Sequence, residues 1–237
     1  MTATAQYAAL LKLDVPAVTT ADAAAVWGAS IASASHALRR LATHDLVVPV
    51  RRGLWALRSK TDPLLLLEYV TAPYPAYVSL HSALHAHGMV EQVPVTTWGI
   101  TLGRPGRVRT AVGTYSLHRV APSFFGGYVQ LPSGVKLATP EKALVDVFYL
   151  SATRNRVFAS LPEVELPATF RVSTAREWIR KIPSARLRLI ATSRLEALLR
   201  PTPPPARAAA APRSALPGPR APRASRTPPP RPPPARR

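Results

Sequence analysis

Glu141, Lys142 and Asp146 are the residues whose types and spacing first suggest chemistry in this chain. Two acids and a lysine around a metal ion form the active site of many nucleases, in which an acid and the lysine stand two positions apart on a strand. Here Glu141 and Lys142 are adjacent in a segment with a helical pattern, so their side chains point about 100° apart. We expect Glu141 to stabilise a helix start, and Lys142 and Asp146 to form a surface ion pair. The sequence therefore predicts no catalytic residues.

A histidine cluster, His81, His85 and His87, is the second candidate for chemistry. His81 and His85 are spaced i,i+4 on a predicted helix and share a face, as two zinc ligands do. His87 points elsewhere and the chain has no cysteine, so a third ligand is missing. We interpret the pair as polar residues of a surface helix and predict no metal and no cofactor.

Three further arginines, Arg104, Arg107 and Arg109, surround glycines in the segment GITLGRPGRVRT. The glycines lie in a strand-turn context, which is not that of a phosphate-binding loop. The arginines make a basic turn that is either a second nucleic-acid contact or a solvated loop.

The net charge of +19 favours a polyanionic partner, most often nucleic acid and less often an acidic membrane surface. Residues 201–237 contain eight arginines, fourteen prolines and no acidic residue, which predicts a disordered, partly polyproline tail. We expect no signal peptide and no membrane span, because the longest aliphatic cluster covers only residues 64–67. A cytoplasmic, nucleoid-associated protein is the expectation.

The elements that must position a nucleic-acid contact lie in the first 58 residues. Residues 3–13 predict a helix, Thr19 or Thr20 can cap a short second helix that ends at Gly28, and Ser30 can cap a third. The third helix has an apolar stripe made of Ile31, Ala34, Leu38 and Leu41. Two strands, residues 46–50 and 54–57, then flank Arg51-Arg52-Gly53.

Two short helices joined by a turn with glycine, followed by a hairpin with a basic tip, are typical of a winged helix-turn-helix that binds DNA. The polar residues of the third helix would contact base edges or phosphates, and the hairpin arginines would contact the backbone. The predicted DNA-binding residues are Ser30, Ser33, His36, Arg39, Arg40, Arg51 and Arg52.

The region 59–200 has mixed helix and strand patterns. One helix is predicted to begin at Asp62, and a second helix, capped by Ser79, is predicted to end at Gly88. Strands are predicted to follow over 93–102, 108–120, 128–132 and 135–138. Thr139 and Pro140 begin a helix buried through Ala143, Leu144, Val147 and Leu150, and residues 163–172 predict a strand or extended loop. Helices near 173–181 and 184–199 complete the prediction.

The blocks TTADAAAVWG…RRGLWAL, YVSLHSALHAHGMVEQVP and LATPEKALVDVFYL, in this order, resemble the AbiEi-type antitoxins of type IV, abortive-infection toxin–antitoxin systems. The resemblance covers about residues 5–190, and the family pattern has no counterpart of the tail. It implies that the N-terminal domain binds inverted repeats in the operon's own promoter. It also implies that the second domain counters a nucleotidyltransferase-like toxin without a stable complex.

The resemblance places a set of residues in the antitoxin domain, namely Ser79, Ala83, Leu84, Gly88, Thr139, Pro140, Glu141, Lys142 and Asp146. The predicted fold class is α+β: a winged helix-turn-helix (1–58), a mixed α/β antitoxin domain (59–200) and a disordered tail (201–237). We expect a dimer or paired monomers on palindromic double-stranded DNA. Two alternatives stay open, a nucleic-acid enzyme targeted by the winged helix and a repressor that senses a small ligand.

Overall fold

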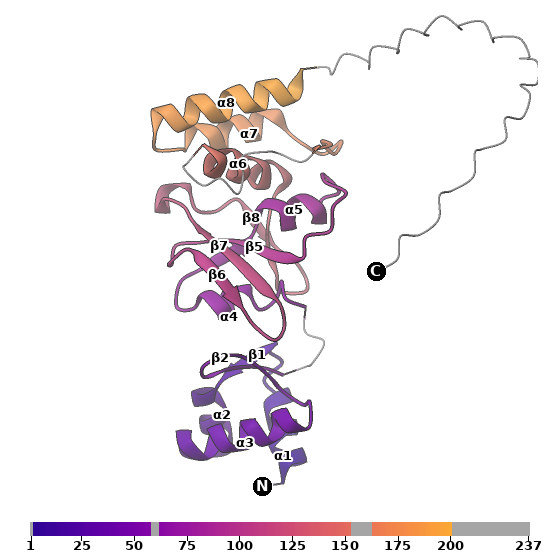
Figure 1. Ribbon diagram of the computed structural model, residues 1–237, viewed down its shortest axis with the longest axis vertical. Coiled ribbons are helices and arrows are strands. Elements are labelled where there is room, and N and C mark those ends of the chain that lie inside the picture. The colour runs from indigo at the N-terminus through magenta and orange to yellow at the C-terminus, as the bar shows by residue number, and fades with distance from the viewer. Residues whose placement is uncertain (1, 58–61, 153–162, 201–237) are drawn as a thin grey trace, which may run out of the picture. The chain divides into compact units, whose positions relative to one another are not determined.

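The computed structural model describes residues 2–57, 62–152 and 163–200 (Figure 1). The predicted tail of residues 201–237 lies outside the described residues. Within the described part, eight α-helices and two sheets confirm the mixed α+β class. No helix in that part is both long and apolar enough to cross a membrane.

Three helices open the chain, and their ends are set by local capping. They are α1 (Ala3–Leu11), α2 (Thr20–Trp27) and α3 (Ile31–Thr43). The Thr19 hydroxyl accepts the N–H of Asp22 at 3.1 Å, and the Asp22 carboxylate accepts the N–H of Thr19 at 2.8 Å. This reciprocal capping box begins α2, and Gly28 ends it at φ +60°. The Ser30 hydroxyl caps α3 by accepting the N–H of Ser33. The predicted ends of α2 and start of α3 are confirmed, whereas α1 ends at Leu11, two residues before the predicted end.

The predicted apolar stripe of α3 is wrong at one position. Ile31 is 56 % exposed, whereas Ala34, Leu38 and Leu41 are buried together with Ala37. Ile31 is the first residue of the helix, directly after the turn, and the first buried residue of α3 is Ala34. Periodicity predicts the face of a residue but not where along a helix its neighbours begin.

A three-stranded antiparallel sheet follows, in the order β1-β3-β2. Its strands are β1 (Ala17–Thr19), β2 (Val48–Arg51) and β3 (Leu54–Ala56). The β2–β3 hairpin was predicted; β1 was not, because three residues are too few to show alternation. The sheet is buried on both faces, with Val18 in the core of α1–α3, and Ala17 and Leu54 in the core of the larger sheet.

The larger sheet has six strands in the order β6-β7-β5-β4-β9-β8. They are β4 (Ala76–Val78), β5 (Thr96–Thr101), β6 (Gly106–Arg109), β7 (Thr114–Arg119), β8 (Tyr128–Gln130) and β9 (Lys136–Ala138). Two neighbour pairs, β5/β7 and β4/β9, are parallel and the others are antiparallel. The segment predicted as one strand from residue 108 is a hairpin, because residues 110–113 form a turn.

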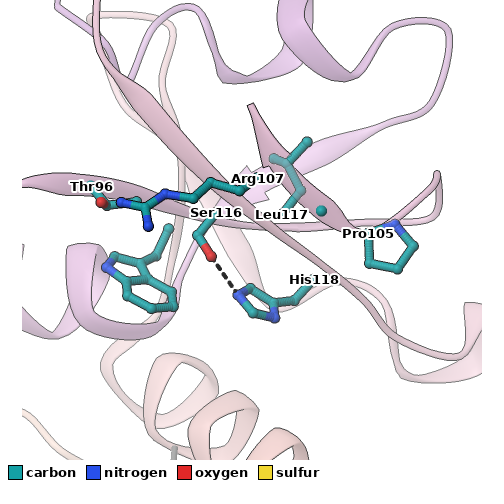
Figure 2. Close-up of a pocket in the computed structure, with 8 residues that line it drawn as sticks. Thr96, Pro105, Arg107, Ser116, Leu117 and His118 are labelled. Atoms are coloured by element: carbon teal, nitrogen blue, oxygen red, sulfur yellow. Dashed lines mark hydrogen bonds between the residues drawn. The ribbon is translucent and has the colours of Figure 1, made fainter. Parts of the chain in front are cut away.

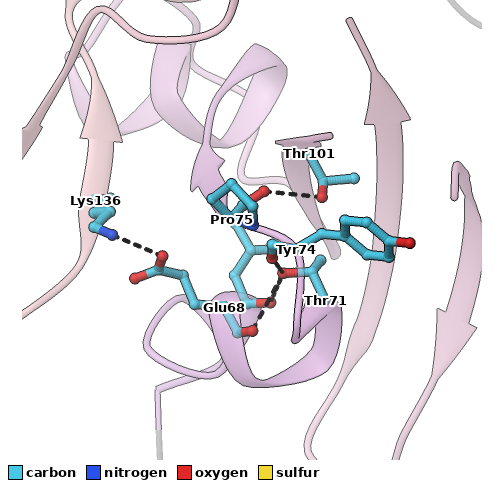
Figure 3. A network of polar contacts seen from close by, with 7 residues as sticks. Glu68, Thr71, Tyr74, Pro75, Thr101 and Lys136 are labelled. Atoms are coloured by element: carbon cyan, nitrogen blue, oxygen red, sulfur yellow. Dashed lines mark hydrogen bonds and ion pairs between the residues drawn. The ribbon is translucent and has the colours of Figure 1, made fainter. Parts of the chain in front are cut away.

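A short segment before the larger sheet pins several elements together (Figure 3). Helix α4 (Leu67–Thr71) begins later than the predicted start at Asp62, because residues 63–66 form a turn first. The Thr71 hydroxyl donates to the carbonyl of Tyr74, and the Lys136 ammonium donates to Glu68 at 2.8 Å. The segment is thus fixed both within itself and to β9.

Four helices, with a 3₁₀ turn at Pro122–Phe124, complete the described fold. They are α5 (Leu80–Ala86), α6 (Pro140–Ser151), α7 (Val172–Arg180) and α8 (Ala185–Leu199). Helix α6 packs against α5, α7 and α8 and is buried on nearly all sides (Figure 1). The three predicted helices after residue 139 are confirmed, and the described residues 163–171 form an extended segment and a turn.

Candidate functional site

The polar face of α3 is the first of two candidate sites. Ser33, His36, Arg39 and Arg40 are all exposed, as predicted, and α3 contains no acidic residue. The Ser30 hydroxyl lies 3.0 Å from that of Ser33, so the two form one hydroxyl pair at the start of the helix. The Arg40 guanidinium donates to the side-chain carbonyl of Gln6 at 3.0 Å, which ties it to α1. The result is a positive face with small side chains at its N-terminal end.

The two arginines of the β2–β3 hairpin have different surroundings. The Arg51 guanidinium donates to the backbone carbonyls of Tyr69 at 3.3 Å and Ala72 at 3.2 Å, which belong to the α4 segment. Arg52 lies exposed at the turn beside Gly53, whose φ of +78° makes the sharp reversal possible. Arg51 therefore ties the hairpin to α4, and Arg52 is the arginine that faces solvent at the tip.

The different surroundings of Arg51 and Arg52 predict that one substitution lowers stability and the other weakens DNA binding. Arg51→Ala should lower the free energy of unfolding by about 1 kcal/mol through two lost hydrogen bonds to carbonyls. If the exposed Arg52 contacts a phosphate, as the sequence predicts, Arg52→Ala should weaken DNA binding and leave stability unchanged. Urea denaturation and fluorescence anisotropy with labelled DNA measure the two quantities. Equal effects of both substitutions on DNA binding would contradict the separation.

The second candidate is a buried polar cluster that joins two distant segments. The Asp146 carboxylate accepts hydrogen bonds from Ser79 Oγ at 2.7 Å, from Tyr77 Oη at 3.1 Å and from Lys142 Nζ. The Lys142 and Asp146 side chains are both 0 % exposed. The predicted surface pair is therefore wrong: it is an ion pair in the core, because α6 is covered by α5, α7 and α8.

Aromatic rings surround the Lys142 ammonium on its other sides. Nζ lies 3.8 Å from the ring centre of Phe124, 4.9 Å from that of Trp178 and 5.5 Å from that of Tyr77. Gly127, at φ +73°, makes the close approach possible, because a Cβ there would lie 2.5 Å from Trp178. The electron-rich ring faces replace part of the water that an exposed ammonium would have.

Burial dominates the electrostatics of this cluster. Desolvation lowers the pKa of Lys142 and raises the pKa of Asp146, and each partner opposes the shift of the other. Burial and then the Asp146 charge raise the pKa of Tyr77, so its phenol stays protonated and donates. Glu141 is also buried, and its carboxylate accepts the backbone N–H of Arg171 at 2.8 Å. All three residues of the nuclease hypothesis therefore hold the fold together.

Most of the residues assigned to the antitoxin domain cap helices, form turns or pack in the core. Thr139 caps α6 and Pro140 is its first residue, as predicted. Ala83 and Leu84 are fully buried, and Gly88 follows α5 at φ +67°. Ser79 precedes α5 but makes no side-chain cap, because its hydroxyl donates to Asp146 instead.

The three histidines of the predicted cluster make different contacts. His81 is half-buried and tilts against Trp98 with ring centres 5.0 Å apart. His85 Nδ1 lies 3.3 Å from the carbonyl oxygen of Val90, and His87 Nε2 lies 2.7 Å from that of Ala138. Among the described residues, no group of three His, Cys, Asp or Glu side chains could hold a metal ion.

Comparison with known proteins adds no assignment: no family model matches the chain, and a search of curated proteins finds no match.

Two groups of residues were missed from the sequence. Tyr77, Phe124 and Trp178 complete the environment of Lys142, and no sequence spacing links them. Trp98, Ser116 and His118 line a cavity on the larger sheet. Here a signal existed, since polar residues alternate with Tyr115 and Leu117 along β7.

Proposed function

We propose that this chain is a DNA-binding autorepressor and antitoxin of the AbiEi type, with a winged helix-turn-helix as its N-terminal region. The observation that carries the proposal is the exposed, acid-free face of α3, which the β2–β3 hairpin with the exposed Arg52 follows in the chain. Helices α2 and α3 are joined by a turn at Gly28, which matches the connection of a helix-turn-helix. The net charge of +19 supports a nucleic-acid partner.

In this proposal α3 enters the major groove by its N-terminal half. Ser33 and His36 reach base edges, because the small residues around them permit close approach. Arg39 and Arg40 contact phosphates, and Arg52 contacts the neighbouring backbone or minor groove. The operator is a pair of inverted repeats in the protein's own promoter, bound by a dimer or by two monomers.

The antitoxin role rests on the resemblance, with one structural point in support. The two segments that carry the resemblance in the second region meet at Ser79 and Asp146, 67 residues apart in sequence. The partner is a nucleotidyltransferase-like toxin, countered without a stable complex by a cytoplasmic protein. The enzyme alternative has less support, because Glu141 and Asp146 are buried and bonded within the protein.

The test is binding to the DNA upstream of the gene, measured against a scrambled duplex of the same length and composition. We expect a sequence-specific complex whose affinity falls about 100-fold between about 50 and about 200 mM salt, as for about four neutralised phosphates. Equal affinity for the scrambled duplex would contradict the proposal, since it would assign binding to general attraction by the basic chain.

A further inference from the structure

One face of the larger sheet carries polar and aromatic side chains in a regular row. Arg107 of β6 pairs with Ser116 of β7, and Ser116 pairs with Trp98 of β5. Paired residues of neighbouring strands share a face, so these three side chains stand side by side across the strands. Thr96 and His118 stand two positions away on β5 and β7 and share that face.

A cavity of about 440 Å³ lies on this face, over the strands β5, β6 and β7 (Figure 2). It is lined chiefly by Thr96, Trp98, Pro105, Arg107, Ser116 and His118. Arg107 extends along the sheet toward Thr96, and Ser116 bonds to His118 (Figure 2). The volume is within the range of small-ligand sites. Arginine is the one permanently charged residue of this lining, and no acidic residue is part of it.

The backbone holds the Trp98 side chain in position. The N–H of Trp98 donates to Ser82 Oγ at 2.9 Å, and its carbonyl accepts the N–H of Ser79 at 3.0 Å. The indole ring centre lies 5.0 Å from that of His81 and 5.6 Å from that of His118. Burial lowers the pKa of His118 to about 4, so this ring is neutral at pH 7 and can accept or donate one hydrogen bond.

We propose that this cavity binds a nucleotide, with the base against Trp98 and the phosphate on Arg107. Aromatic stacking recognises any base, and the planar guanidinium matches a phosphate. The hydroxyls of Thr96 and Ser116 line the same cavity and supply hydrogen bonds to the base edge or sugar. Arg104, which precedes β6, and Arg109 of β6 are exposed and extend the positive charge beyond the cavity. The site does not depend on operator binding by α3.

The test is calorimetric titration of the full chain with AMP, adenosine and ribose 5-phosphate. We expect AMP to bind more tightly than either fragment, because only AMP offers both base and phosphate. Trp98→Leu and Arg107→Ala should each weaken AMP binding about tenfold. Arg119→Ala is the matched control, because it removes the same charge from the neighbouring strand β7. Arg119 pairs with Thr101 on the opposite face of the sheet, so this variant should bind AMP normally.

A 5′-phosphorylated hexadeoxyadenylate distinguishes the source of the nucleotide. Tighter binding than AMP, with the same loss on Arg107→Ala, assigns the site to single-stranded nucleic acid; equal binding assigns it to free nucleotides. The proposal is overturned if ribose 5-phosphate binds as well as AMP, or if neither Trp98→Leu nor Arg107→Ala changes AMP affinity. Arg107 is exposed, so its variant decides the matter if Trp98→Leu does not fold.

Discussion

Replacing Asp146 by alanine is expected to lower the free energy of unfolding by about 3–5 kcal/mol. The substitution leaves the Lys142 ammonium buried without its counter-charge and the hydroxyls of Ser79 and Tyr77 without their acceptor. Native domains are stable by only about 5–15 kcal/mol, so the loss would be a large part of the total. Urea denaturation followed by far-UV circular dichroism measures it.

Two matched variants identify the cause. The double substitution Lys142→Met with Asp146→Leu removes both charges and keeps the volume, so it should be more stable than Asp146→Ala alone. Glu68→Ala breaks the ion pair between Glu68 and Lys136, whose side chains are 37 % and 27 % exposed respectively. This substitution should lower the free energy of unfolding by only about 0–1 kcal/mol. If Asp146→Ala cost no more than Glu68→Ala, the buried pair would not stabilise the fold as described.

Reversing the charge of Arg39 is expected to weaken specific DNA binding strongly. Arg39→Glu places a carboxylate on the exposed face of α3 and should weaken operator binding about 100-fold, since it loses one phosphate contact and adds repulsion of the next. Stability should stay unchanged because Arg39 is exposed. Fluorescence anisotropy with the operator duplex measures the affinity.

Arg176→Glu on α7 is the control for net charge, because it makes the same exchange at an exposed position of the second region. It should reduce binding only slightly, through the weaker overall field. Similar losses in the two variants would show that the whole surface attracts DNA, and the assignment of α3 as the recognition helix would then be wrong.

Local signals in the sequence determined the helix ends of this protein. Thr19 with Asp22, Ser30, and Thr139 with Pro140 begin helices as predicted, because a cap depends only on residues within one turn. Exposure along most of α3 was predicted for the same reason, since a 3.6-residue period assigns each side chain to a face. The DNA-binding candidates were thus available before the fold was known.

Contacts between distant segments decided the rest. The i,i+4 spacing of Lys142 and Asp146 is the same for a surface pair and a core pair, and only the packing of α5, α7 and α8 around α6 buries it. Arg51 and Arg52 are neighbours with the same charge, yet the α4 carbonyls engage only Arg51 among the bonds described. The row of Arg107, Ser116 and Trp98 exists because three strands align in register. Burial and register depend on segments far apart in the chain, so tertiary structure alone determines them.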